Sequence, residues 1–78
     1  MGRTTVAEAL CEVLRERRLA AGLSQEALAH KAGVHRTYVG MLERGLRNPT
    51  VEVAAQLAEA LGIALSRLIR EAEKRADG

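Results

Sequence analysis

The stretch LSQEALAHKAGVHRTYVGMLERG, residues 23–45, holds two short segments with helical periodicity, separated by a glycine. Ser24 has the side chain of a helix N-cap, and Leu28 and Ala32 follow it on one helical face. Gly33 then lies where the left-handed C-cap of a helix is expected. The spacing predicts a helix of about eight residues that starts after Ser24 and ends at Gly33.

The second segment, from about Arg36 to Arg44, separates into two faces when its residues are placed roughly 100° apart. Val39 and Leu42 lie on one side and are expected to pack inward. Thr37 lies on the opposite side and is expected to be exposed. Gly40 costs roughly 1 kcal/mol relative to alanine in a helix centre, so we expect it to permit a close approach, either of a ligand or of the preceding helix.

The rest of the chain contains three more segments with helical periodicity. They run from about Thr5 to Ala20, from Thr50 to Gly62, and from Leu65 onward, with the charged residues 73–78 expected to fray. One tyrosine is the sole aromatic residue, so the core must consist of Leu, Val, Ile and Ala, which favours helices. We therefore predict an all-α, compact five-helix domain spanning residues 1–78, with its core at about residues 6–72.

Positive charge is concentrated in the middle of the chain. Residues 15–50 contain seven Lys or Arg and three Glu, a net charge of +4, whereas residues 1–14 and 51–78 each carry −1. A localised basic region fits a polyanion-binding face better than a uniformly solvated surface. The charged residues of the last segment are expected to form a solvated helix face: Arg67, Arg70, Glu71, Glu73, Lys74 and Arg75.

Two short helices joined by a tight turn at residues 33–35 form a helix-turn-helix. In this motif the second helix enters the major groove of DNA and the first crosses the backbone. Double-stranded DNA is therefore the expected partner. The scarcity of aromatic side chains argues against a binder of single strands, because such proteins stack bases on aromatic rings.

Other classes of function are excluded by what the chain lacks. Cys11 and the two histidines do not have metal-ligand spacing, so we expect no metal and no cofactor. No nucleophile–base pair or phosphate-binding loop is present, so we do not expect an enzyme. A chain this short has no room for a small-molecule pocket of roughly 300 Å³ or more. No apolar stretch approaches about 18 residues, so we expect a cytoplasmic protein without a membrane partner.

The order and spacing of several sequence blocks resemble the Xre/Cro phage-repressor helix-turn-helix family. The resemblance covers about residues 10–70 and is especially close to the controller proteins of restriction–modification systems, which implies a lambda-repressor-like DNA-binding fold and a bacterial or phage origin. The blocks that carry it are Leu23–Ala29, Gly33-Val34, Tyr38-Val39, Leu42–Gly45 and Arg47–Thr50.

The resemblance also implies roles for individual residues. Arg36 and Thr37 occupy the positions that read bases, where arginine suits guanine O6 and N7 and threonine suits a thymine methyl group. A structural ion pair is implied between Arg18 and Glu43. Contacts to the DNA backbone or groove are implied for Gln25, His35, Tyr38, Arg44, Arg47 and Asn48.

For several of these residues a purely structural interpretation stays open. Gln25 is also typical of a first helical turn, although the family glutamine contacts phosphate and braces the base-reading side chain. His35 could cap its helix, and Tyr38 could be a half-buried packing residue. Arg44 and Arg47 could be ordinary solvated charges.

One domain of this size makes few base contacts, and proteins of this class pair two half-sites about 34 Å apart. We therefore expect a homodimer on a palindromic or pseudo-palindromic operator, and RNA polymerase is a further candidate partner. The residues expected at the dimer interface are Val51, Leu65, Ile69 and Ala72.

The leading interpretation is a transcriptional regulator of the restriction–modification controller type. A phage-type repressor and an antitoxin regulator are alternatives within the same class. A protein-interaction adaptor that uses the same fold is an alternative from a different class, against which the basic residues of the central region argue.

Overall fold

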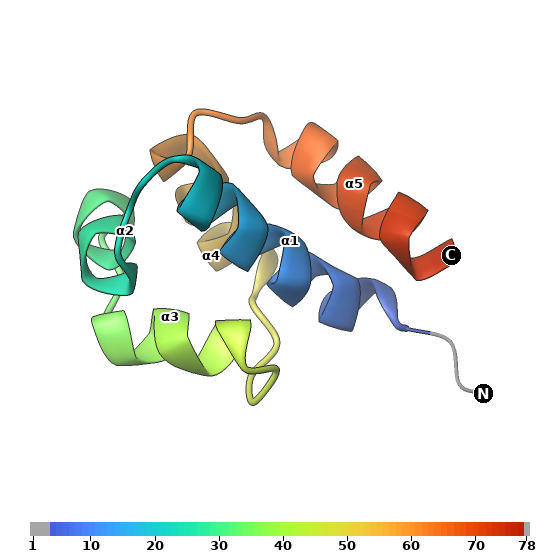
Figure 1. Ribbon diagram of the computed structural model, residues 1–78, viewed down its shortest axis with the longest axis horizontal. Helices are drawn as coiled ribbons and strands as arrows, with labels where there is room; N and C mark the ends of the chain where they lie inside the picture. Colours follow the sequence, from blue (N-terminus) through green and yellow to red (C-terminus); the bar gives the residue numbers. More distant parts are fainter. Residues whose placement is uncertain (1–3, 78) are drawn as a thin grey trace.

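The computed structural model describes residues 4–77. These residues form five α-helices and no strand (Figure 1), as the sequence predicts: α1 (Val6–Ala20), α2 (Gln25–Ala32), α3 (Arg36–Glu43), α4 (Val51–Ala60) and α5 (Leu65–Asp77). None of the helices in this range is long and apolar enough to cross a membrane.

Side chains cap the helix N-termini, as expected at Ser24 and Thr50. The Ser24 hydroxyl accepts a hydrogen bond from the backbone N–H of Ala27, and the Thr50 hydroxyl accepts one from Val53, each at 3.0 Å. Thr5 forms a capping box with Glu8 at the start of α1. Each cap satisfies a backbone donor that the helix leaves unpaired, which is worth about 1 kcal/mol.

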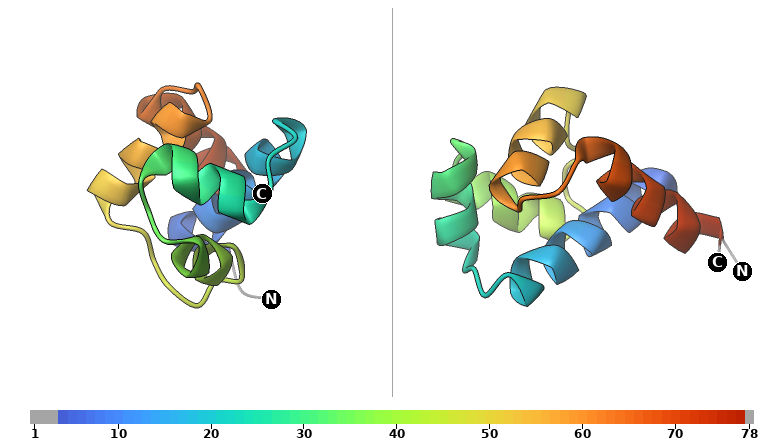
Figure 2. Two further views of the ribbon diagram at one scale, coloured as in Figure 1. Left: turned by 90° about the vertical axis from the view of Figure 1, so that its left-hand side faces the viewer. Right: turned by 90° about the horizontal axis from the view of Figure 1, so that it is seen from above.

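Glycines in the left-handed conformation end α2 and α3. Gly33 has φ 73°, and the following residue, Val34, donates its N–H to Ala29 O at 3.0 Å. Gly45 has the same φ, and Leu46 donates to Met41 O at 2.9 Å. These bonds satisfy carbonyl groups at each C-terminus and turn the chain sharply. The turn after α2 is therefore short, and α3 crosses α2 steeply (Figure 2).

All five helices contribute to one apolar core. α5 packs along α1 in the opposite direction, while α2 packs against α3 and α4 (Figures 1 and 2). The largest fully buried side chains come from every helix: Leu14, Leu28, Val39, Leu42, Leu57 and Leu68. The core is therefore aliphatic, as the composition predicts.

A buried ion pair joins α3 to α1. Arg18 donates from Nε and Nη2 to the two carboxylate oxygens of Glu43, at 2.6 and 2.9 Å, and from Nη1 to the Leu23 carbonyl at 2.8 Å. The side chains are only 9% and 2% exposed. The structure thus contains the pair that the family resemblance implies, and the pair is nearly free of solvent.

The end of α5 differs from the prediction. The helix continues to Asp77 and does not fray after Ala72. Charged side chains hold it on α1, because Glu71 pairs with Arg17, and Arg75 pairs with Glu12 and Glu16. The prediction that all charges of this helix form a solvated face was therefore wrong for Glu71 and Arg75.

The structure also contradicts the predicted role of Ala72 at a dimer interface. It is 0% exposed and belongs to the core of its own chain. A dimer interface cannot use a side chain that is already fully covered by the monomer. The prediction of an interface role for Ala72 was wrong because the fold places this residue, together with Leu68, in the core of its own chain.

We predict that Glu43→Gln destabilises the fold by about 3 kcal/mol, because it leaves the Arg18 charge buried without a counter-charge. The loss is measurable as a lower urea midpoint at neutral pH. Glu71→Gln is the control, since it breaks a more exposed pair and should cost less than about 1 kcal/mol. Equal losses in the two variants would contradict a special role for the buried pair.

We also predict that Glu71 contributes to acid sensitivity. The hydrogen bond from Arg17 lowers the pKa of Glu71 below its ordinary value of 4.5. Its contribution to stability is therefore present above pH 4.5 and is lost as the pH falls through the lowered pKa. In urea titrations from neutral to acidic pH, Glu71→Gln should show a shallower loss of stability below pH 4.5 than the wild type. Parallel curves would contradict this prediction.

Candidate nucleic-acid interface

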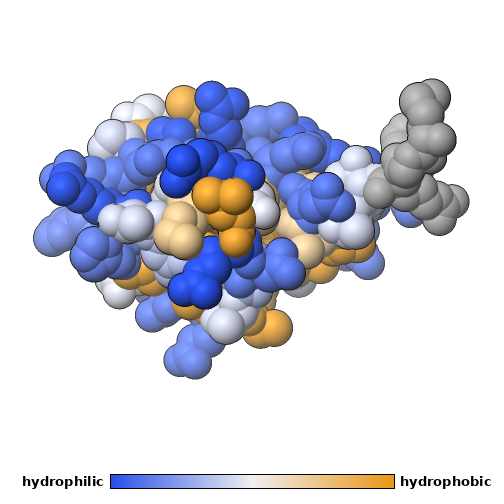
Figure 3. All heavy atoms as spheres, turned by 90° about the horizontal axis from the view of Figure 1, so that it is seen from below, coloured by the Kyte–Doolittle hydropathy of each residue, from blue (hydrophilic) through white to orange (hydrophobic). Residues whose placement is uncertain are grey.

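The face formed by α3 and the loop after it carries most of the predicted site residues. Figure 3 views the molecule from this side and shows a largely hydrophilic surface with a few apolar side chains. The predicted residues with exposed side chains on α3 and the loop are Arg36, Thr37, Arg44, Arg47 and Asn48. The fold thus brings residues from two separate sequence blocks onto one surface.

α3 has the two faces that its periodicity predicts. Val39 and Leu42 are 2% and 1% exposed and fix the helix to the core. Thr37 is exposed on the other side. Tyr38 is half-buried and packs against the edge of the core, so its ring contributes to packing, and a contact with DNA stays a prediction.

A shallow groove separates the N-terminus of α2 from α3. It brings Arg36 and Thr37 of α3 next to the first turn of α2. The groove is lined by Arg18, Ser24, Gln25, Glu26, Arg36, Thr37, Gly40 and Arg44. It contains both predicted base-reading residues and is therefore the centre of the candidate interface.

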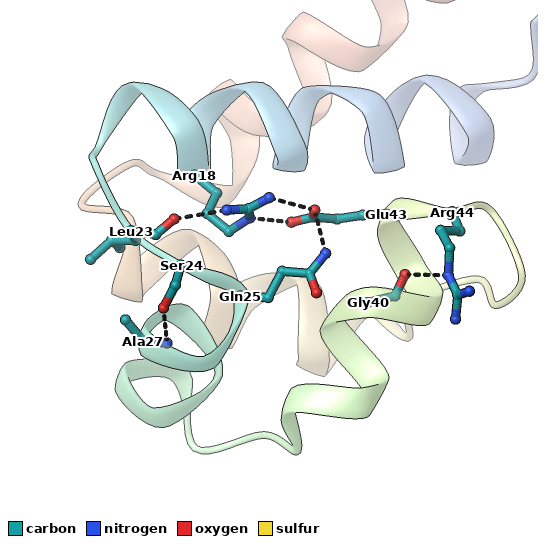
Figure 4. Close-up of polar contacts among 8 residues, drawn as sticks. All are labelled: Arg18, Leu23, Ser24, Gln25, Ala27, Gly40, Glu43 and Arg44. Atoms are coloured by element: carbon teal, nitrogen blue, oxygen red, sulfur yellow. Dashed lines mark hydrogen bonds and ion pairs between the residues drawn. The ribbon is translucent and has the colours of Figure 1, made fainter.

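Gln25 lies across this groove and contacts α3 directly (Figure 4). Its Nε2 donates a hydrogen bond to Glu43 Oε1 at 3.1 Å. Its Oε1 lies 3.3 Å from the position that a Cβ atom on Gly40 would occupy. Gly40 therefore leaves room for the Gln25 side chain. The group that Gln25 braces is Glu43, and not the base-reading side chain expected from the family resemblance.

Sequence reasoning missed the partner of Arg36. Its Nη1 donates to Glu26 Oε2 at 3.2 Å, and the two side chains are 67% and 74% exposed. From the sequence, Glu26 is an ordinary acidic residue in the first turn of a helix, where its negative charge interacts favourably with the helix dipole. Its position ten residues before Arg36 gives no signal for the pairing, because only the turn after α2 brings the two together.

Two further residues of the site interact with backbone groups at the ends of α3. His35 caps the helix, with Nδ1 accepting from Thr37 N–H at 3.3 Å. Arg44 donates from Nε to Gly40 O at 3.4 Å, while its side chain remains exposed (Figure 4). The capping interpretation of His35 is thus correct, and a phosphate contact stays a prediction.

The basic residues of the central region differ in whether another helix covers and neutralises them. Arg17 and Arg18 face other helices, where Glu71 and Glu43 neutralise them. Arg36, Arg44 and Arg47 are exposed on the α3 face. Two of the seven basic residues in this region are therefore not available to a ligand.

The residues predicted for the dimer interface lie on α4 and α5. Val51 begins α4 and is 79% exposed, which is unusual for a large apolar side chain. Leu65 and Ile69 of α5 are half-buried and partly cover the core. α4 and α5 pack against each other, so these three residues belong to adjacent elements, and none of them lines the α2–α3 groove.

Comparisons with known proteins agree with this geometry. Control protein C.SmaI of Serratia marcescens is 42% identical over 64 residues, which are 82% of this chain and 76% of that protein. Among solved structures, the restriction-modification controller protein C.AhdI from Aeromonas hydrophila is 44% identical with a TM-score of 0.75, over 81% of this chain and 94% of the other. The clp gene regulator ClgR from Corynebacterium glutamicum is 29% identical with a TM-score of 0.90, over 97% and 81%.

The family model HTH_3, described as helix-turn-helix, matches residues 14–68. This range contains α2, α3 and the groove between them, and it covers more than half of the chain. The relatives include controller proteins of the kind that the sequence blocks resemble. The chain belongs to the HTH_3 helix-turn-helix family of transcriptional regulators.

Proposed function

We propose that this protein binds double-stranded DNA sequence-specifically and regulates transcription. The observation that carries the proposal is the division of α3 into a buried side, which fixes its position, and an exposed side with Arg36 and Thr37. An exposed, rigidly held helix with its N-terminal side chains free to contact base edges is what major-groove reading requires.

In the proposed complex, Arg36 and Thr37 contact bases. Arg36 presents several parallel N–H donors, which match O6 and N7 of guanine. The Thr37 methyl and hydroxyl suit a thymine methyl group or a polar base edge. These two residues supply the sequence preference of each half-site.

Contacts with the DNA backbone fix the orientation of α3 in the groove. Arg44 and the loop residues Arg47 and Asn48 extend the interface beyond the C-terminus of α3 and suit phosphate oxygens. Gln25 and His35 lie at the N-termini of α2 and α3, where phosphates are favoured by the helix dipole. Tyr38 lies at the margin of this surface.

We further propose that the DNA-binding form is a homodimer. The Cα extents of one chain are 36 × 23 × 22 Å, so two copies side by side can place their α3 helices about one DNA turn, roughly 34 Å, apart. Val51, Leu65 and Ile69 are the apolar residues that we assign to such an interface. Their position on α4 and α5 leaves the α2–α3 groove open for DNA.

The specific biological role that we propose is that of a restriction–modification controller. The similarity to C.SmaI and C.AhdI supports this role. RNA polymerase is then a candidate partner at the promoter. A methyltransferase or endonuclease gene beside this one would support the proposal, whereas a neighbouring toxin gene or prophage genes would favour the alternatives of an antitoxin regulator or a phage repressor.

We predict that Arg36→Ala weakens operator binding by roughly 1–3 kcal/mol and relaxes the preference at one base pair of each half-site. Selection from random duplexes, followed by binding measurements at several salt concentrations, tests this. Arg47→Ala is the matched control, because losing a phosphate contact should weaken all sequences alike and reduce the salt dependence. The same loss of specificity in both variants would contradict the division into base and backbone contacts.

We predict that Val51→Glu and Ile69→Glu weaken self-association by about tenfold or more, because the two-fold axis brings each new charge near its own copy. Sedimentation at micromolar concentration measures the change. Leu19→Glu is the control, since it adds the same charge at another exposed apolar position, the end of α1. A wild-type monomer that also binds DNA as a monomer would contradict the dimer.

A further inference from the structure

The exposed contact between Glu26 and Arg36 is the least expected feature of the candidate interface. A carboxylate lies 3.2 Å from the guanidinium that is proposed to read a base. Negative charge on a surface for DNA opposes binding to the phosphate backbone. The position of Glu26 therefore requires an explanation other than general affinity for a polyanion.

Stability of the fold does not supply that explanation. The side chains are 67% and 74% exposed, and ion pairs this accessible to water contribute little to folding. The two backbones are nevertheless held rigidly relative to each other, because the first turn of α2 is capped by Ser24 and tied to α3 through Gln25 and Glu43. The backbone of Glu26 thus has a fixed position relative to α3, from which its carboxylate reaches Arg36.

We propose that Glu26 is a positioning residue that determines the specificity of Arg36. This inference rests on the proposed DNA-binding function and deepens it. The contact with Glu26 uses Nη1 of the guanidinium. The Nε and Nη2 donors are left for the two acceptors of a guanine edge. A long side chain that is already oriented loses less conformational entropy on binding.

The charge of Glu26 also discriminates between a base edge and a phosphate. Without it, Arg36 is free to turn toward the nearest phosphate on any sequence. With it, a phosphate must compete with the carboxylate for Arg36 and is repelled by it at short range. A guanine edge is uncharged and meets less repulsion, so Glu26 lowers non-specific binding more than specific binding.

The test compares Glu26→Gln with Glu52→Gln. Both substitutions remove one negative charge from an exposed second residue of a helix, in α2 and α4 respectively, so their effects on net charge and helix dipole are matched. Affinities for the selected operator and for a random duplex are measured over a range of salt concentrations. Glu26→Gln should reduce the ratio of the two affinities by about 3- to 10-fold, whereas Glu52→Gln should leave the ratio unchanged.

Two further measurements connect the effect to Arg36. In the Arg36→Ala background, Glu26→Gln should no longer change the ratio of affinities. In selections from random duplexes, Glu26→Gln should relax the same base pair as Arg36→Ala. An unchanged ratio overturns the inference. Relaxation at a different base pair also overturns it, because that result would indicate that Glu26 itself accepts a hydrogen bond from a cytosine amino group. A wild-type protein that selects no sequence overturns the proposed function itself.

Discussion

The orientation of α3 depends on the buried pair between Arg18 and Glu43. A helix of eight residues is too short to be stable by itself. Val39 and Leu42 attach it to the core, but apolar contacts are not directional. The two-point pairing of a guanidinium with a carboxylate is directional, and at this degree of burial it is little weakened by solvent. The pair thus specifies how α3 lies on α1, and the exposed side of α3 follows from it.

The same carboxylate joins a third helix. Besides the two bonds from Arg18, Glu43 accepts one from Gln25, so a single side chain of α3 is bonded to α1 and α2. This arrangement brings the Gln25 amide close to α3, and the missing side chain of Gly40 provides the space for it. The glycine within this helix is therefore linked to the groove, because a Cβ atom at this position would lie 3.3 Å from Gln25 Oε1, so the Gln25 amide would have to shift slightly.

The features that could be predicted from the sequence depend on residues that are close together along the chain. Ser24, Thr50, Gly33 and Gly45 mark helix ends through bonds made within a few positions of each, and the inward side of α3 follows from its period. The features that could not be predicted join distant residues. Ala72 was assigned to a dimer interface because periodicity shows that a helix has an apolar face but does not identify what covers it.

Distance along the chain likewise explains the misjudged charges. Arg75 contacts Glu12 and Glu16 across more than fifty positions, which extends α5 beyond its apolar pattern. The family resemblance supplied the pair Arg18–Glu43, which composition and spacing alone do not reveal. The resemblance did not indicate the ion pair between Glu26 and Arg36.

The ion pairs of this protein have different roles according to how deeply they are buried. Exchanging the partner of Arg18 for a ligand would leave Glu43 charged and uncompensated in the interior, so this arginine is committed to the fold. Arg36 and Glu26 are both hydrated, and separating them costs little. Only a pair of the second kind can hold a side chain in place before binding and release it to a ligand. The number of arginines in the central region therefore says less about DNA binding than the exposure of each arginine's partner.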